Sequence, residues 1–277
     1  MVWMIWNTLR DQWDEAFDQF EHWGIKGIKM DFMNRDDQPM VEFYEAVAAK
    51  AAEKKMVVNF HGAYKPSGLS RKYPNVLTRE ALIEFEQSGV SDNDNPEHNN
   101  LLPYIRMFTG AMDYIPATIK NGNKNDFRHF GDYPMGWGTR AHAMALFVIL
   151  NSPMTMLPGS PSDYYREKEC TDCLAKIPVE WDETKLLSGK IGQYTVLARR
   201  SGTDWHIGAI TNDDSRTIEL PTDFLQPGKY QITIIEDGMN ARTAATDYKL
   251  LRHQITAGET IKINMAPGGG WLARITP

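Results

Sequence analysis

The chain has 277 residues, of which 42% are hydrophobic and 24% are charged. This is the composition of a globular protein, and it excludes a disordered or collagen-like chain. The 36 acidic residues outnumber the 30 basic ones, which gives a net charge of −6, and the basic residues are scattered along the chain. A nucleic-acid partner is therefore not expected.

Over about the first 160 residues, short apolar runs alternate with amphipathic helical segments. Apolar residues recur at helical spacing from Leu9 to Trp23, which predicts a helix that ends at Gly24. Further helices are predicted over residues 39–54 and 139–150. Strands are predicted at residues 2–6, 27–32, 56–60, 75–78, 112–115 and 153–157. Because strands that alternate with helices form βαβ units, this pattern predicts a parallel sheet.

Beyond residue 190, the predicted elements are strands separated by turns. They lie at residues 194–198, 205–210, 230–235 and 260–264, and Gly, Pro, Asn and Asp bound them. The chain is therefore expected to divide near Ser188 and Gly189. The α/β part would be residues 1–188, and a small antiparallel β domain would follow over residues 189–277.

The two cysteines, Cys170 and Cys173, have C-x-x-C spacing in a predicted helix. A zinc site would need a second pair of ligands, and a redox site would follow a strand, so we interpret both as ordinary helix residues. No run of 18 apolar residues is present, and no membrane partner is predicted. Residues 1–7 lack the basic region and cleavage site of a signal peptide.

Polar side chains gather where the predicted strands end, which is where a βα barrel carries its active site. Lys29 and Asp31 lie two apart, so both point to the same side of their strand. Glycoside hydrolysis needs two carboxylates, and Asp31 and Glu86 are a candidate pair. A single aspartate at a strand end is more often a helix cap or a hydrogen-bond acceptor. These residues alone leave a hydrolase and an isomerase both open.

Five blocks of the chain resemble those of glycoside hydrolase family 97: residues 27–38, 58–68, 73–80, 96–99 and 110–116. The resemblance runs from about Val2 to Pro277. It implies a (β/α)8 TIM-type barrel that lacks its first strands, followed by an antiparallel β domain. Residues 2–6 would be roughly the third of eight strands. A large N-terminal β-sandwich of the same enzyme would be missing, and the location would be periplasmic or secreted.

Inverting members of this family carry a glutamate directly after the histidine of the second block and lack the aspartate at the strand end. This chain has Gly62 after His61 and keeps Asp31, so it resembles the retaining group. The resemblance implies that Asp31 is the nucleophile and Glu86 the general acid/base, with carboxyl groups about 5 to 5.5 Å apart. It further implies an exo-acting α-galactosidase that hydrolyses terminal α-galactosides by double displacement. The alternatives are an α-glucosidase or another α-glycosidase on the same scaffold, or an inactive truncated fragment.

Family members carry a calcium ion near the active site, which implies metal ligands at Glu80 and Glu86 and one more from the missing N-terminal domain. Two glutamates alone would form an incomplete site, because calcium takes six or more oxygen ligands. The alternative interpretation of Glu80 is an ion pair with Arg79 or a solvated helix start.

Lys29, His61 and Trp6 are interpreted as substrate-binding residues: the first two would contact substrate hydroxyls, and Trp6 would offer an aromatic surface to a sugar ring. The segment after Arg79 departs from the family, where it is commonly glycine-rich. Here residues 81–86 read Ala-Leu-Ile-Glu-Phe-Glu, which makes Glu84 a second candidate for the acid. Glu86 is preferred because it keeps the expected offset from Glu80.

Overall fold

The computed structural model describes residues 1–116 and 119–277. These residues divide into two compact units. The first unit comprises Met1–Leu82, Arg106–Tyr114 and Ser152–Met154. The second unit comprises Ile83–Ile105, Ile115–Asn151 and Thr155–Pro277.

A parallel sheet with the strand order β1-β2-β3-β4 is the centre of the first unit. Its strands are β1 (Val2–Ile5), β2 (Gly27–Asp31), β3 (Val57–Phe60) and β4 (Val76–Arg79). Beyond β4, Met112 forms an isolated parallel bridge with Arg79. The predicted parallel sheet is therefore confirmed, although the predicted strand at residues 112–115 shortens to bridge residues.

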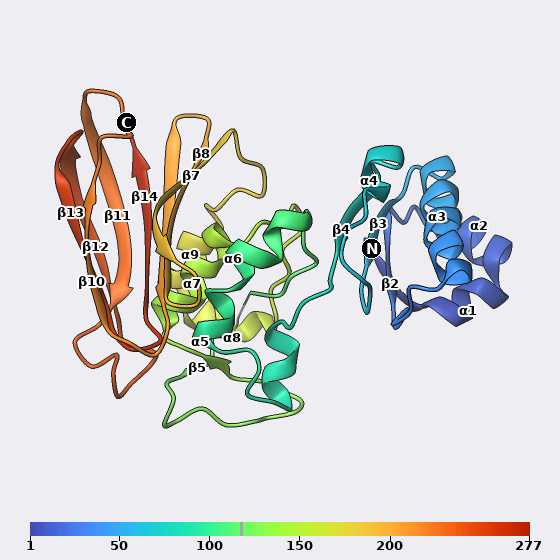
Figure 1. Cartoon of the computed structure of the whole chain (residues 1–277), viewed down its shortest axis with the longest axis horizontal. Helices are drawn as coiled ribbons and strands as arrows, with labels where there is room; N and C mark the ends of the chain where they lie inside the picture. The colour runs from blue at the N-terminus through green and yellow to red at the C-terminus, as the bar shows by residue number, and fades with distance from the viewer. Residues whose placement is uncertain (117–118) are drawn as a thin grey trace. The chain divides into compact units, whose positions relative to one another are not determined.

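Helices cover this sheet: α1 (Trp6–Asp11), α2 (Trp13–His22), α3 (Gln38–Glu53) and α4 (Leu69–Lys72). Figure 1 shows α1, α2 and α3 in blue on one side of the strands. The single helix predicted up to Gly24 is two helices, because the backbone of Gln12 leaves the helical region at φ −129° and ψ 34°. Helix α3 begins with Asp37, whose side chain accepts a hydrogen bond from Met40 N, and Pro39 lies in its first turn.

A six-stranded antiparallel sheet dominates the second unit, with the strand order β12-β11-β14-β9-β8-β7. Its strands are β7 (Glu183–Lys190), β8 (Tyr194–Ser201), β9 (Asp204–Thr211), β11 (Lys229–Asp237), β12 (Tyr248–Thr256) and β14 (Gly270–Thr276). A second antiparallel pair is formed by β10 (Arg216–Pro221) and β13 (Thr260–Met265). The predicted antiparallel β structure is confirmed (Figure 1). Strand β7 runs across positions 188 and 189.

Helix α7 (Arg140–Ile149) packs on the sheet of the second unit over β9 and β14. Thr139 caps it by accepting a hydrogen bond from His142 N. The helix approaches the strands closely at Gly208, where an added Cβ would lie 2.8 Å from Ala145 O. Glycine at position 208 therefore sets the distance between helix and sheet.

The remaining short elements are η1 (Phe85–Gly89), α5 (Pro96–Asn99), α6 (Leu102–Ile105), η2 (Met107–Thr109), β5 (Asn121–Gly122), β6 (Gly136–Trp137), α8 (Pro161–Arg166) and α9 (Lys168–Leu174). The strand predicted at residues 153–157 is wrong, because only residue 155 forms a bridge there. Cys170 and Cys173 lie on α9 as free thiols. Among the described residues, no helix is long and apolar enough to cross a membrane.

Candidate active site

Asp31 is the last residue of β2 and is only 7% exposed. Its carboxylate accepts two hydrogen bonds, from Trp3 Nε1 at 2.8 Å and from Phe32 N at 2.6 Å. Trp3 lies on the neighbouring strand β1. The predicted nucleophile is thus a buried carboxylate held at a parallel strand end.

The structure brings together two further predicted residues, Lys29 and His61, on a carboxylate that sequence reasoning missed. Asp113 is fully buried, and its Oδ2 lies 2.9 Å from Lys29 Nζ and 2.6 Å from His61 Nδ1. Asp113 Oδ1 accepts a hydrogen bond from Asn59 Nδ2 at 2.8 Å. The signal in the sequence was an aspartate inside an apolar strand prediction, between Met112 and Tyr114.

Asp113 is ionised at neutral pH. Burial by itself would raise the pKa of this carboxyl. The hydrogen bond from His61, the positive charge of Lys29 and the hydrogen bond from Asn59 outweigh burial and hold the pKa below its ordinary value. The ion pair between Lys29 and Asp113 lies in a nearly dry position, with the Lys29 side chain only 11% exposed.

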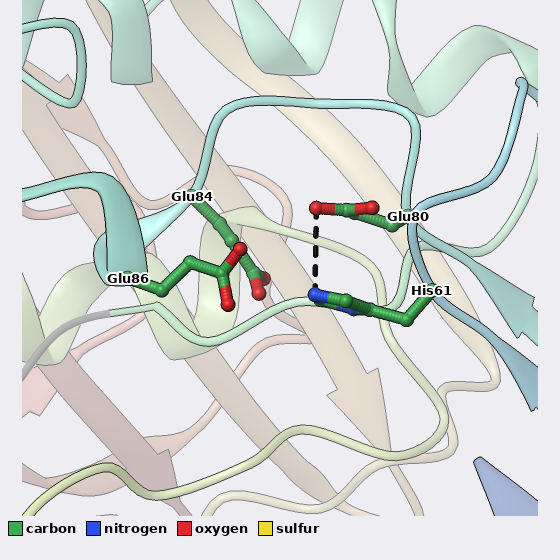
Figure 2. Close-up of side chains that lie close together, drawn as sticks. All are labelled: His61, Glu80, Glu84 and Glu86. Carbon is green, nitrogen blue, oxygen red and sulfur yellow. Dashed lines mark ion pairs between the residues drawn. The ribbon is translucent and has the colours of Figure 1, made fainter. Parts of the chain in front are cut away.

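His61 also faces Glu80, the predicted calcium ligand. Its Nε2 lies 3.5 Å from Glu80 Oε1, and Figure 2 marks this ion pair with a dashed line. The other oxygen of Glu80 accepts a hydrogen bond from Gly62 N at 2.5 Å. Arg79, the alternative ion-pair partner of Glu80, instead stacks on aromatic rings. Its Cζ lies 4.3 Å from the ring centroid of Tyr44 and 4.5 Å from that of Tyr64.

Gly62 lies against the backbone that follows Asp31. Its φ is +54°, and an added Cβ would lie 2.8 Å from Phe32 N and 3.1 Å from Asp31 Oδ1. A side chain at position 62 would therefore compete for space with the carboxylate of Asp31. The position of the Asp31 carboxylate therefore requires glycine at position 62.

Glu84 and Glu86 belong to the second unit, whereas His61 and Glu80 belong to the first. All four side chains are drawn in Figure 2 and are of types that hold metal ions. Glu84 is fully buried, and its Oε2 accepts a hydrogen bond from Ile115 N at 2.7 Å. Glu86 lies in η1 and is exposed. Asp31 and Glu86 belong to different units. The predicted distance between their carboxyl groups therefore stays a prediction.

Two residues beside the predicted site have left-handed backbone conformations. Phe32 follows Asp31 with φ 60°, and Ala81 follows Glu80 with φ 50°. Such conformations cost roughly 1–2 kcal/mol for a residue with a Cβ and concentrate at functional sites. Both strained positions redirect the chain directly after a predicted functional carboxylate.

A cavity of about 330 Å³ opens in the first unit next to Glu80. Its lining consists of residues 34–36, 62–64 and 80–82. Trp6 occupies a different position from the one predicted, since it is the first residue of α1 rather than the end of β1. The Trp6 ring contacts the Phe43 ring edge-on, with the two ring centroids 5.9 Å apart. The Cζ atoms of Arg10 and Arg35 lie 5.1 Å and 5.7 Å from the Trp6 ring centroid.

Comparison with known families gives two matches. Residues 1–82 match the family described as Glycoside hydrolase 97. Residues 180–276 match the family described as Glycosyl-hydrolase 97 C-terminal, oligomerisation.

Individual relatives agree with these matches. A retaining alpha-galactosidase of Bacteroides thetaiotaomicron is 38% identical over 277 residues, which is 99% of this chain and 42% of that protein. A probable retaining alpha-galactosidase of Streptomyces bingchenggensis is 29% identical, over 95% of this chain and 38% of its own length. A solved glycoside hydrolase family 97 enzyme in complex with acarbose, from Pseudoalteromonas sp. strain K8, is 29% identical with a TM-score of 0.87, over 97% of this chain and 44% of that one. The chain thus spans less than half the length of these relatives.

Proposed function

Because the chain belongs to glycoside hydrolase family 97, we propose that it acts as a retaining, exo-acting α-galactosidase on terminal α-galactosides or oligosaccharides that carry them. The observation that carries this proposal is the buried carboxylate of Asp31 at the end of β2, in a chain 38% identical to a retaining alpha-galactosidase. The proposal concerns the activity of the whole enzyme, since this chain corresponds to 42% of that relative.

In the proposed reaction, Asp31 attacks the anomeric carbon and forms a glycosyl-enzyme ester, while Glu86 protonates the departing oxygen. Glu86 then removes a proton from water, which attacks the same carbon and releases Asp31. The hydrogen bonds from Trp3 and Phe32 support the nucleophile role, because they hold the Asp31 carboxylate in one orientation. The carboxyl groups of Asp31 and Glu86 are expected about 5 to 5.5 Å apart.

The choice of Glu86 over Glu84 as the acid is supported by their surroundings. Glu84 is fully buried and engaged with the backbone at Ile115, whereas Glu86 is exposed. A group that exchanges a proton with both substrate and water needs access to both.

Lys29 and His61 are proposed to donate hydrogen bonds to substrate hydroxyls, and Trp6 to provide an aromatic surface for the sugar. The cavity beside Gly62 and Glu80 supports a small-molecule site in this region.

A calcium site with Glu80 and Glu86 as ligands is part of the proposal. Their carboxylates fit calcium, which prefers hard oxygen donors, and Glu80 is already fixed by its hydrogen bond from Gly62 N. His61 fits calcium poorly because it offers nitrogen. The ion would supply positive charge that holds these carboxylates in place.

The fold proposal is a TIM-type barrel in residues 1–188, lacking its first strands, with a C-terminal β domain over residues 189–277. Four parallel strands and the parallel bridge at Met112 support it. An N-terminal domain of the same enzyme and a periplasmic or secreted location are proposed from the family resemblance.

The test follows hydrolysis of nitrophenyl α-galactoside and nitrophenyl α-glucoside by the purified 277-residue chain and by the whole enzyme, and activity of the whole enzyme alone would identify the chain as an inactive fragment. We expect faster hydrolysis of the galactoside and, by NMR, the α-anomer as the first product. A β-anomer formed first would contradict Asp31 as the nucleophile, and a preference for the glucoside would favour the α-glucosidase alternative.

The acid is tested with two matched variants. Glu86→Gln should slow both formation and hydrolysis of the glycosyl-enzyme, whereas Glu84→Gln should not. The reverse result would assign the acid to Glu84.

A further inference from the structure

The buried carboxylate of Asp113 has no role in the proposed reaction, yet it is the common partner of three side chains from the neighbouring strands. Lys29 comes from β2, Asn59 comes from β3, and His61 directly follows β3. All three lie within 2.9 Å of an Asp113 oxygen, as measured from Lys29 Nζ, Asn59 Nδ2 and His61 Nδ1. One anion therefore gathers donors from two strands that are adjacent in the sheet.

The position of Asp113 is itself fixed by the backbone. Its N–H donates to Arg79 O at 2.8 Å, next to the parallel bridge between Arg79 and Met112. The guanidinium of Arg106 donates to the same carbonyl at 2.7 Å. The carboxylate is thus attached to the sheet edge beyond β4, on residues that all belong to the first unit.

An ionised carboxylate has no proton to donate, so it imposes a direction on each hydrogen bond it shares. His61 Nδ1 lies 2.6 Å from Asp113 Oδ2 and must carry the proton between them. His61 Nε2 is thereby turned away from Asp113 and toward Glu80. The ammonium of Lys29 is held in the same way by a charged partner in a nearly dry position.

We propose that Asp113 is a positioning residue: its buried carboxylate orients Lys29 and His61 and keeps a proton on His61 Nδ1. This inference rests on the proposed function, because it assigns Asp113 to the site in which Lys29 and His61 contact substrate. Carboxylates that orient a functional histidine act in this way in many enzyme sites.

The first test reads the protonation of His61 directly and needs no substrate. Long-range ¹H–¹⁵N NMR of the ¹⁵N-histidine-labelled chain at mildly alkaline pH distinguishes protonated from unprotonated ring nitrogens, and His61→Gln identifies the His61 signals among the seven histidines. We expect a protonated Nδ1. In Asp113→Ala no acceptor faces Nδ1, so the proton should move to Nε2, which faces the Glu80 carboxylate.

An unprotonated Nδ1 in the unaltered chain would overturn the proposal even if the variant failed to fold. A proton that stays on Nδ1 in folded Asp113→Ala, with Nε2 unprotonated, would overturn it as well.

The second test separates positioning from a purely structural role. Asp113→Asn should lower kcat/KM by about 10- to 100-fold, the usual effect of losing a partner that orients a functional residue. Asp94→Asn is the matched control, because it also replaces a buried aspartate, one that accepts a hydrogen bond from Ser88 in the second unit. Its kcat/KM should stay close to that of the unaltered protein.

Equal losses of kcat/KM in both variants, in proportion to their thermal stability, would contradict positioning. If the whole enzyme hydrolyses no glycoside, the proposed function fails, while the NMR result still decides whether Asp113 orients His61.

Discussion

At the scale of single residues, Gly62 decides what can stand beside Asp31. The left-handed backbone at Gly62 and the absence of a side chain leave room for the Asp31 carboxylate and for the N–H of Phe32 that binds it. The same residue donates its own N–H to Glu80. Gly62 therefore supports both the proposed nucleophile and the proposed metal ligand without any side chain of its own.

We predict that Gly62→Ala destabilises the protein and abolishes most glycosidase activity, because its Cβ would collide with Phe32 N and crowd Asp31 Oδ1. Gly24→Ala is the control, since Gly24 also has a positive φ, of +72°, but faces open space. The free energy of unfolding of the control should fall only by the cost of a left-handed backbone for a residue with a Cβ, roughly 1–2 kcal/mol. Chemical denaturation and initial rates check this, and equal behaviour of the two variants would contradict it.

Asp94 gives a pH-dependent prediction. Burial raises the pKa of this carboxyl from its ordinary value of 3.8 to about 7, against the lowering effect of the hydrogen bond from Ser88. The folded state thus binds the proton more tightly than the unfolded state, so the Asp94 contribution to stability is full below pH 3.8 and is lost as the pH rises through about 7. Asp94→Asn should therefore gain stability relative to the unaltered chain between these pH values.

Denaturation midpoints measured across this pH range check the effect of Asp94. Asp126 is exposed, so the midpoints of Asp126→Asn should change with pH in the same way as those of the unaltered chain. A constant difference between Asp94→Asn and the unaltered chain at all pH values would rule out the linkage.

At the scale of elements, the sequence predicted best where one face of an element is buried. The apolar periodicity of α3 and the apolar runs of β2 and β3 predicted elements whose apolar residues are buried in the structure. Strand β12 was missed because most of its residues are exposed, so its sequence has no clear alternation. The role of Asp113 was not predicted, because its partners Lys29 and Asn59 come from other strands and only the register of the sheet brings them together.

Helix α7 provides the prediction at this scale. Gly208→Ala would place a Cβ 2.8 Å from Ala145 O and 2.9 Å from Ile149 Cγ1, so the helix must move away from β9. Overpacking of this kind typically costs about 1–3 kcal/mol. Gly131→Ala, where an added Cβ meets nothing within 4 Å, should change stability by less than about 0.5 kcal/mol. Similar denaturation midpoints for the two variants would refute the close packing.

At the scale of the whole molecule, the two units have separate hydrophobic cores. One core, which includes Met30, Val58 and Phe60, lies in the first unit. Another, which includes Ile207 and Trp271, lies in the second unit. Units with their own cores need not unfold in one step.

We therefore expect two transitions in differential scanning calorimetry. Met30→Ala, which empties space in a fully buried position and should cost about 2–5 kcal/mol, should lower only one of them. Gly208→Ala should lower only the other. A single transition shifted by both variants would show that the units unfold together.

The discontinuity of the first unit has a consequence for how the protein is made. Asp113 follows His61 by 52 positions, and synthesis at about 5–20 residues per second separates the two by roughly 3 to 10 s. During that interval on the ribosome, Lys29, Asn59 and His61 have been synthesised but their shared anion has not. The polar cluster is therefore completed only after Asp113 has been synthesised, and slow codons between positions 61 and 113 would lengthen the interval in which its three donors lack this partner.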